Sequence, residues 1–423
     1  MNPYIIDDIP GDKSISHRAI MIASLATGTT TFKGFLTSDD CLNTLNIFRQ
    51  MGVQIDQDNT TITVHGVGKN GLKSPSDTLD VGNSGTAIRL ISGLLCGTSV
   101  NASMTGDASI QQRPMDRILQ PLTQMGANIT AINGYPPLTI IGNPKHIHPI
   151  EYRLPVASAQ VKSAILLAGV SANVPVSVIE PEPCRDHTER MLRLFGLDVK
   201  YDKGCITLKP HPLQAPKTPV QIPADISSAL FFICNALMTN QSVIFKNIGL
   251  NESRIGCLTV LKQMGANIQI TPKETGFEPM GDIHVMPSNQ MKNICVPVDL
   301  IPNVIDELPI LATLASTLPG EFKVRNASEL RVKESDRIEG IVRLMNAIKI
   351  PVESVADGFT IQGQPGRVIN DFEYDANDDH RLAMSAFIVA GAHQVTAQVT
   401  GTHSISTSFP NFRHILQKIR LGK

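Results

Sequence analysis

One stretch in the C-terminal half of the chain brings together residue types that bind and transform anions. Residues 333–337 read Lys-Glu-Ser-Asp-Arg, which combines two cations, two carboxylates and a hydroxyl. The residues after them are apolar at helical spacing, so we expect the charged residues at the N-terminal end of a helix. Free backbone N–H groups and partial positive charge at such an end favour anions. A single stretch of this kind is more often a solvated helix start, so the rest of the chain must decide.

Similar polar groups stand at the start of other expected helices. Ser, Asp and Asn there are ordinarily capping residues, and each one taken singly is best interpreted that way. Arginine is not a capping residue, and its recurrence in both halves of the chain indicates a shared anionic ligand between two domains. The groups are Lys13, Ser14, Ser16 and Arg18; Asp39 and Asp40; Asn83 to Thr86; Arg113; Ser158 and Gln160; Arg185 and Asp186; Asp225, Ser227 and Ser228; Arg254; Asp306 and Glu307; and Asp379, His380 and Arg381.

Internal repeats predict the elements that position these residues. The sequence Gln-Met-Gly-Ala-Asn-Ile occurs at 124–129 and again at 263–268, and looser copies occur elsewhere in the chain. Each copy is typical of a helix that ends in a Gly or Asn cap and is followed by a strand. A more apolar helix is expected upstream of each copy, and such helices recur six times at intervals of 68 to 78 residues.

The chain is therefore expected to fold as α/β (α+β), with six units of the order strand, helix, strand, helix, strand, strand. A chain of 423 residues is longer than a single hydrophobic core usually supports. The six units should therefore form two domains with three units each. We expect the first domain at 12–222 and the second at 1–11 with 223–423. The sixth unit stops at its second helix, so its missing strands need another source. Tyr4-Ile5-Ile6 is the expected donor.

Composition excludes several classes of partner. The balance of 37 basic against 38 acidic residues, with 4% aromatics and no Trp, lacks the features of nucleic-acid binding. No apolar run approaches the ~18 residues that span a membrane. The N-terminus has neither a basic region nor an apolar stretch, which argues against a secretory signal. The seven cysteines form no C-x-x-C pair, so zinc and disulfides are not expected and a reducing cytoplasm fits.

Six motifs follow one another along essentially the whole chain: Gly11 to Arg18, Gly82 to Arg89, Arg113 to Met115, Ser158 to Gln160, Arg331 to Arg337, and Asp379 to Arg381. Together they resemble the motifs of the enolpyruvyl transferases, and specifically of the 5-enolpyruvylshikimate-3-phosphate synthases. The resemblance implies two domains of three βαβαββ units, an inverted α/β barrel whose helix N-termini point at an interdomain cleft.

The same resemblance implies the reaction and its partners. The 5-hydroxyl of shikimate 3-phosphate attacks phosphoenolpyruvate, a tetrahedral intermediate forms, and phosphate leaves to give an enolpyruvyl ether on the path to chorismate and the aromatic amino acids. No metal or organic cofactor is implied. The expected partners are the two small-molecule substrates, with no nucleic acid and no membrane, and a cytoplasmic monomer is expected.

Residue roles also come from the resemblance. Both substrates carry a phosphate and a carboxylate, so their approach requires dense cationic compensation, to which planar Arg side chains are suited. The positions that match the family's phosphoenolpyruvate site are Lys13, Asn83, Gly85, Arg113, Gln160, Arg337 and Arg381. The positions that match its shikimate 3-phosphate site are Lys13, Ser14, Arg18, Ser158, Ala159, Gln160, Arg185, Asp306 and Lys333.

Proton transfer requires a base for the hydroxyl and an acid for the methylene carbon. Asp306 matches the family's proton acceptor, and Glu334 is the candidate acid. Lys13 either assists Glu334 or competes with it, and the sequence leaves this open because closely placed titrating groups share a proton.

The chain departs from the best-known form of the family at a few positions. It has Glu329 where that form has Asn, and Thr407 lies where that form has Lys, so no function is carried onto either residue. Ala159 and Arg185 accompany these changes in a second subgroup. Gly85 lies where some members tolerant of the inhibitor glyphosate carry Ala, so the chain is expected to be inhibited competitively with phosphoenolpyruvate.

Three other functions are less consistent with the sequence. An enolpyruvyl transferase acting on UDP-N-acetylglucosamine typically carries a reactive Cys near the Arg113 segment, whereas residues 107–113 contain none. A non-catalytic repeat scaffold does not need Asp306 and Glu334 beside arginines. A metal site of Asp378, Asp379 and His380 is disfavoured because three adjacent residues at a helix start cannot all face one ion.

Overall fold

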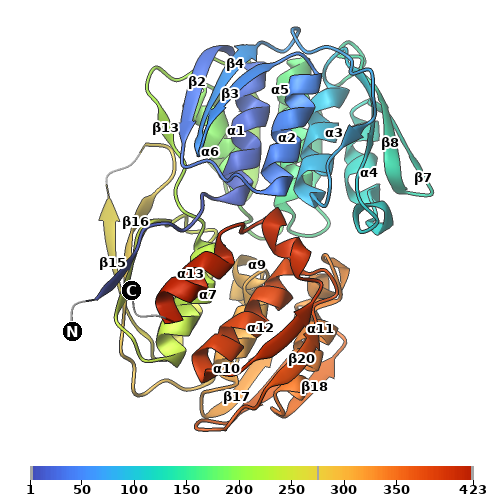
Figure 1. Ribbon diagram of the computed structural model, residues 1–423. Helices are drawn as coiled ribbons and strands as arrows, with labels where there is room; N and C mark the ends of the chain where they lie inside the picture. The colour runs from blue at the N-terminus through green and yellow to red at the C-terminus, as the bar shows by residue number, and fades with distance from the viewer. Residues whose placement is uncertain (1–2, 274–275, 421–423) are drawn as a thin grey trace. The chain divides into compact units, whose positions relative to one another are not determined.

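The computed structural model describes residues 3–273 and 276–420, which divide into two compact units (Figure 1). The N-terminal unit holds Gly11–Ile222 and Gly276–Glu278, and the C-terminal unit holds the remaining described residues. Each unit has its own apolar core. Helices and strands alternate along both, as predicted for an α/β chain.

The N-terminal unit contains three four-stranded sheets of one design. In each, a first strand pairs in parallel with a second, and an antiparallel hairpin completes the sheet. The sheets run β13 (Val220–Gln221), β2 (Thr27–Lys33), β4 (Thr61–Val67), β3 (Gln54–Asp58); β5 (Leu79–Asp80), β6 (Asn101–Thr105), β8 (Tyr135–Ile141), β7 (Asn128–Ile132); and β9 (Ile150–Arg153), β10 (Val176–Ile179), β12 (Cys205–Lys209), β11 (Asp198–Asp202). Two helices accompany each sheet: α1 (Lys13–Leu25) and α2 (Asp39–Gln50), α3 (Gly85–Cys96) and α4 (Asp116–Gln124), α5 (Ala159–Ala172) and α6 (His187–Leu194).

The C-terminal unit repeats the design with losses toward the end of the chain. Its sheets run β1 (Tyr4–Ile6), β14 (Val243–Gly249), β16 (Met280–Met286), β15 (Asn267–Lys273); β17 (Gly320–Val324), β19 (Gly358–Gly363), β18 (Val352–Val355); and the parallel pair β20 (Phe372–Asp375) and β21 (Ala397–Thr400). Its helices are α7 (Ile226–Met238), α8 (Gly256–Gln263), α9 (Ile301–Val304), α10 (Leu308–Ala315), α11 (Arg337–Ala347), α12 (His380–His393) and α13 (Phe412–Arg420).

The N-terminal strand has a different partner from the one predicted. β1 pairs in parallel with β14, in the sheet of the fourth unit, and does not extend the β20–β21 pair of the sixth. The strand before α7, β13, pairs instead with β2 in the N-terminal unit. In a regular repeat β1 would pair with β2, and β13 would pair with β14. The structure exchanges these two partners. Repeat counting cannot detect this exchange because both strands precede equivalent helices.

A short segment also departs from the predicted domain limits. Gly276–Glu278 groups with the N-terminal unit although its neighbours along the chain belong to the C-terminal unit. The Glu278 carboxylate hydrogen-bonds to Nδ1 of buried His187 over 2.7 Å, and Phe277 packs against the apolar core of the N-terminal unit. A polar contact and an apolar contact therefore hold this segment in place.

Side-chain caps begin the helices that carry the predicted site residues. Asp12 accepts a hydrogen bond from the backbone N–H of Ile15 in α1, and Ser84 accepts one from Ala87 in α3. Ser158 caps α5 in the same way. Each cap satisfies one of the backbone donors that a helix start leaves open. The polar residues Asp12, Ser84 and Ser158 at these starts are thus structural caps.

Helices α3 and α5 lie close enough to require glycine at their contact. A Cβ built on Gly93 of α3 would lie only 2.6 Å from the Cα of Ala164 in α5. No larger residue fits there without moving a backbone. The contact fixes the start of α3, and with it Gly85, relative to the start of α5. Across residues 3–273 and 276–420, no helix has both the length and the apolar character needed to cross a membrane.

Candidate functional site

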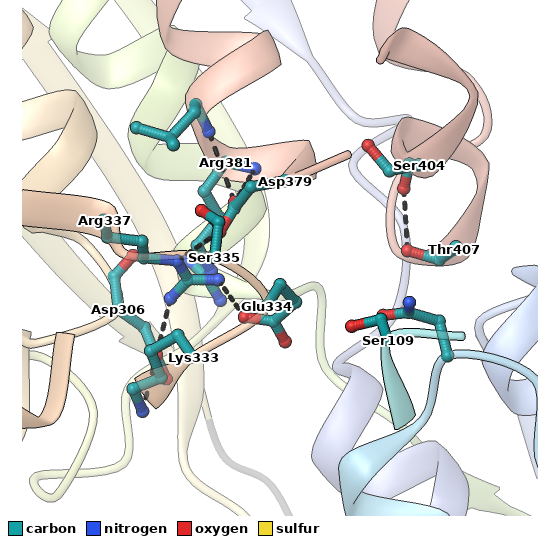
Figure 2. A network of polar contacts seen from close by, with 12 residues as sticks. Ser109, Asp306, Lys333, Glu334, Ser335, Arg337, Asp379, Arg381, Ser404 and Thr407 are labelled. Carbon is teal, nitrogen blue, oxygen red and sulfur yellow. Dashed lines mark hydrogen bonds and ion pairs between the residues drawn. The ribbon is translucent and has the colours of Figure 1, made fainter. Parts of the chain in front are cut away.

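The C-terminal unit gathers five of the predicted residues in one place, here called the C-terminal cluster: Asp306, Lys333, Glu334, Arg337 and Arg381 (Figure 2). They come from the segment before α10, the segment before α11, the first residue of α11 and the first turn of α12. Helix starts from two successive repeat units thus converge around Arg337.

Arg337 is the centre of this cluster and is almost fully buried, with 1% of its side chain exposed. Its Nε donates to Asp379 Oδ2 over 2.8 Å, Nη1 to Asp306 Oδ1 over 3.2 Å, and Nη2 to Glu334 Oε2 over 2.5 Å. Burial alone lowers the pKa of Arg337, but Asp379, Glu334 and Asp306 outweigh it and raise that pKa above its usual value. The guanidinium is therefore permanently charged.

Asp306, the predicted proton acceptor, lies between two cations. It accepts from Arg337 and also pairs with Lys333, whose Nζ is 3.3 Å from the same oxygen. Two adjacent cations favour the ionised form of a carboxyl group. The ionised form of Asp306, which is the form that can accept a proton, thus has two cationic partners.

Asp379 has two functions, of which the sequence analysis expected only the first. It caps α12, because its Oδ1 accepts from the backbone N–H groups of Arg381 and Leu382. Its Oδ2 accepts from Arg337 and from the Ser335 hydroxyl. A helix cap was foreseeable from an Asp at this position, but the partner of its second oxygen depends on tertiary structure.

The N-terminal unit supplies the other predicted residues, here called the N-terminal cluster: Lys13, Ser14, Arg18, Asn83, Gly85, Arg113, Ser158, Ala159, Gln160 and Arg185. Lys13 opens α1 and forms an ion pair with Asp40, a buried residue of α2. Asp40 had no predicted role. Because Lys13 keeps part of its side chain exposed, it is anchored at a fixed place and still accessible.

Arg18 is buried and bonded mainly to neutral groups. Its Nε donates to Thr188, Nη2 to Ser163 and Nη1 to the backbone oxygen of Ser14. Burial lowers the pKa of Arg18 to about 10, against the opposing effect of nearby carboxylates led by Glu189. The positive charge of Arg185 lowers it further, which places Arg185 in the electrostatic neighbourhood of Arg18.

Asn83, Gly85 and Arg113 lie together at the start of α3. Arg113 Nη2 donates to Asn83 Oδ1 over 3.3 Å and to Ser109 Oγ over 3.2 Å. A Cβ added to Gly85 would lie 2.8 Å from Arg113 Nη1 and 3.0 Å from Arg89 Nη1. Glycine at this position therefore lets two guanidinium groups approach the helix start.

Gln160 joins the start of α5 to the same place. Its Oε1 accepts from Arg89 Nη1 over 2.9 Å, and its Nε2 donates to Thr86 Oγ1 over 3.1 Å. Arg89 also donates to the backbone oxygen of Gly85. Arg89 belongs to a motif that the sequence analysis singled out, but its part in positioning Gln160 was missed because the two residues are distant in sequence.

The sequence analysis also considered a metal site at residues 378–380 and left Thr407 without a function. Within the described residues, no group of three or more His, Cys, Asp or Glu side chains could hold a metal ion, so the weighed site at Asp378, Asp379 and His380 has no support there. Thr407, which carried no assigned function, donates its hydroxyl to the backbone oxygen of Ser404 (Figure 2).

Comparison with known proteins gives a consistent result across the chain. The family model described as EPSP synthase (3-phosphoshikimate 1-carboxyvinyltransferase) matches residues 5–416. A 3-phosphoshikimate 1-carboxyvinyltransferase of Bacillus pumilus is 43% identical over 96% of this chain and 94% of its own length. One from Coxiella burnetii is 44% identical over 98% of this chain and 94% of its own.

Solved structures agree. An EPSP synthase from Acinetobacter baumannii superposes with a TM-score of 0.85 at 42% identity, covering 98% of this chain and 95% of that one. The enolpyruvyl transferase NikO from Streptomyces tendae has a TM-score of 0.74 at 15% identity, over 99% and 94% of the two chains, and supports the fold alone. The predicted enolpyruvyl transferase fold is confirmed, and the chain belongs to the EPSP synthase family, that of the 3-phosphoshikimate 1-carboxyvinyltransferases.

Proposed function

We propose that the chain transfers the enolpyruvyl group of phosphoenolpyruvate to the 5-hydroxyl of shikimate 3-phosphate and releases inorganic phosphate. Family membership along nearly the whole chain supports this activity. The single observation that carries the residue assignment is the C-terminal cluster, in which Asp306 and Glu334 both contact Arg337. The candidate base and the candidate acid thus both lie within hydrogen-bonding distance of the same arginine.

The first step is an addition across the double bond of phosphoenolpyruvate. Asp306 takes the proton of the 5-hydroxyl as the hydroxyl oxygen forms a bond to C2 of phosphoenolpyruvate. Glu334 gives a proton to the methylene carbon. A tetrahedral intermediate results. In the second step Glu334 takes back a proton from the new methyl group and the bond from C2 to the phosphate oxygen breaks. Phosphate departs with the enol ether restored, and the proton on Asp306 leaves with it.

Glu334 must give up its contact with Arg337 before it can act as an acid. In the described residues it accepts from Arg337 Nη2, and a carboxylate so held is stabilised in its ionised form. We assign Arg337 to phosphoenolpyruvate. The phosphate and the carboxylate of this substrate compete with Glu334 for the guanidinium of Arg337. Binding of phosphoenolpyruvate thereby frees Glu334, which can then take up a proton and give it to the methylene carbon of that substrate.

The remaining assignments divide between the substrates. We assign Lys13, Asn83, Gly85, Arg113, Gln160, Arg337 and Arg381 to phosphoenolpyruvate. We assign Ser14, Arg18, Ser158, Ala159, Arg185 and Lys333 to shikimate 3-phosphate, with Lys13, Gln160 and Asp306 contributing to it as well. Lys13 is anchored by Asp40, and we assign Glu334 as the acid. The enzyme acts as a cytoplasmic monomer.

Phosphate release tests the activity directly. The purified chain should release phosphate from phosphoenolpyruvate when shikimate 3-phosphate is present and not when it is absent or replaced by UDP-N-acetylglucosamine. Release with the nucleotide sugar would instead support the sister activity. Thermal stabilisation by DNA, without stabilisation by shikimate 3-phosphate, would support the scaffold alternative. Sedimentation at working concentration tests the monomer.

A further inference from the structure

Arg381 is held by one of its guanidinium nitrogens. Nη1 donates to the backbone oxygen of Asp306 over 2.8 Å and lies 3.5 Å from Glu307 Oε1. Among the described residues, these are the side-chain contacts that the structure gives Arg381, so Nε and Nη2 have no partner there. An arginine fixed at one nitrogen presents the others in a defined direction, which is what a substrate-binding fork requires.

Glu307 is the acidic partner of this arginine and is buried, with 2% of its side chain exposed. It directly precedes α10 but its side chain makes no capping bond to that helix. Its Oε1 instead accepts a short hydrogen bond from the Ser227 hydroxyl and faces Arg381 Nη1. A buried carboxylate is costly unless paired and hydrogen-bonded, so these two contacts explain how it is tolerated.

The other end of this chain of contacts is anchored in turn. Arg254 Nη2 donates to Ser227 Oγ over 2.6 Å and lies 3.3 Å from Asp225 Oδ1. The backbone N–H of Ser227 donates to the same Asp225 oxygen over 2.8 Å. The Ser227 hydroxyl therefore accepts a hydrogen bond from Arg254 and donates one to Glu307. Its orientation is fixed from both sides.

A continuous path thus runs from the starts of α7 and α8 to the start of α12. It passes through Arg254, Ser227 and Glu307 to Arg381, and every step is a hydrogen bond or ion pair between buried or half-buried groups. Such networks rigidify the groups that they join when every member is satisfied. The acidic residue beside the assigned base has an evident use for its charge other than proton transfer.

We propose that Glu307 is a positioning residue for phosphoenolpyruvate binding, which acts through Arg381. Its carboxylate, oriented by Ser227 and Arg254, holds Nη1 of Arg381 and aims Nε and Nη2 at the substrate anion. The inference rests on the proposed function and adds to it a residue that contacts no substrate. Removing the charge of Glu307 leaves Arg381 in place but lets its fork rotate.

The test is the Glu307→Gln variant, which keeps the size of the side chain and its ability to accept from Ser227. We expect the KM for phosphoenolpyruvate to rise on the order of 10-fold, the scale of a hydrogen bond to a charged group. The dissociation constant for shikimate 3-phosphate, measured by calorimetry, should stay within about 2-fold. Glu353→Gln, an exposed change on β18, is the matched control and should alter neither constant.

A double-mutant cycle separates positioning from general damage. Arg381→Ala alone should raise the KM for phosphoenolpyruvate, and adding Glu307→Gln to it should raise that KM no further. An unchanged KM in Glu307→Gln, additive effects in the double variant, or equal losses for both substrates would each overturn the inference. A natural chain that releases no phosphate would overturn the proposed function and the inference with it, so the two failures are distinguishable.

Discussion

The two most buried arginines of the clusters, Arg18 and Arg337, have different hydrogen-bond partners. In the N-terminal cluster, Arg18 donates its side-chain hydrogen bonds to Thr188, Ser163 and a backbone oxygen, and none of these partners carries a charge. In the C-terminal cluster, Arg337 is surrounded by three carboxylates. An anion can approach the neutral partners of Arg18 without displacing a charge. An anion that approaches Arg337 must compete with a carboxylate.

This difference separates binding from chemistry. A group that only holds a phosphate works best if its charge is already directed and makes no hydrogen bond to a carboxylate, as for Arg18. A group that must exchange protons benefits from a neighbouring cation that the substrate can claim, as for Glu334 on Arg337. We therefore expect changes to the carboxylates around Arg337 to affect turnover and stability strongly, and changes around Arg18 to affect mainly affinity.

The largest expected effect is on stability and comes from Asp379. Asp379→Ala removes the α12 cap and leaves the buried charge of Arg337 with one carboxylate fewer. Breaking a buried ion pair by removing one partner costs about 3–5 kcal/mol, and chemical denaturation should show a loss of that size. Asp336→Ala is the matched control. Asp336 caps α11 but pairs with the half-exposed Arg331, so its loss should cost only about 1 kcal/mol.

Equal losses for Asp379→Ala and Asp336→Ala would contradict the comparison. They would mean that the carboxylates around Arg337 contribute no more than ordinary helix caps. The C-terminal cluster could then not be described as a set of buried, mutually compensating charges.

The contrast between these two aspartates also shows how far sequence reasoning reaches. An Asp before an apolar helical run predicts a cap, and both residues are caps. Sequence repeats likewise predicted the six units and the positions of their helix starts. What the sequence could not supply was the partner of each remaining oxygen, because Asp379 and Arg337 belong to different units whose meeting depends on tertiary packing.

The same limit explains the misplaced N-terminal strand. A three-residue strand such as Tyr4–Ile6 has no periodicity that distinguishes one sheet edge from another. Its choice of β14 follows from backbone pairing, Tyr4 opposite Val243 through Ile6 opposite Phe245. The positioning roles of Asp40 and Glu307 were missed for a related reason, since an acidic residue near a helix start is usually solvated. Burial is what makes these two different.

The next largest effect is on turnover. Asp306→Ala and Glu334→Gln should each lower kcat by at least ~100-fold, the usual scale for a general acid or base, with smaller changes in substrate affinity. Steady-state phosphate release measures both constants, and Glu353→Gln again serves as the exposed control. A near-normal kcat in either variant would remove that residue from the catalytic assignment and weaken the view that the C-terminal cluster carries the chemistry.

A smaller effect is expected in the N-terminal cluster, at Gly85. The added methyl group of Gly85→Ala would lie 2.8 Å from Arg113 Nη1, the far end of a flexible side chain, so the guanidinium should shift while the helix stays folded. Overpacking of this kind costs about 1–3 kcal/mol and should fall more heavily on glyphosate than on phosphoenolpyruvate. We expect the ratio of the glyphosate inhibition constant to the phosphoenolpyruvate KM to rise by roughly one to two powers of ten.

Inhibition kinetics on both proteins, with kcat as the internal control, decide this prediction. Since Gly85 lies in the N-terminal cluster, kcat should change less than the ratio does. An unchanged ratio would place Gly85 away from the inhibitor, and the assignment of the α3 start to phosphoenolpyruvate would then be withdrawn. A large fall in kcat with an unchanged ratio would contradict the separation of binding from chemistry.

The smallest expected effect tests whether ion pairs outside the clusters matter. Asp282 on β16 receives hydrogen bonds from Lys273, Lys246 and the backbone of Asn247. Burial raises its pKa, but these bonds outweigh burial and lower the pKa to about 2. A depressed carboxyl pKa contributes stability that is fully present above the unfolded value of about 3.8 and is lost as the pH falls toward 2.

Asp282→Asn should therefore lower the free energy of unfolding by less than about 1 kcal/mol at pH 7, because both lysines are partly exposed and screened by solvent. The difference from the natural chain should shrink as the pH drops from about 4 toward 2. Urea unfolding at several pH values measures it. A loss at pH 7 as large as that of Asp379→Ala would mean that a partly exposed carboxylate contributes as much to stability as a buried one. The stronger effect expected for the carboxylates around Arg337 would then be wrong.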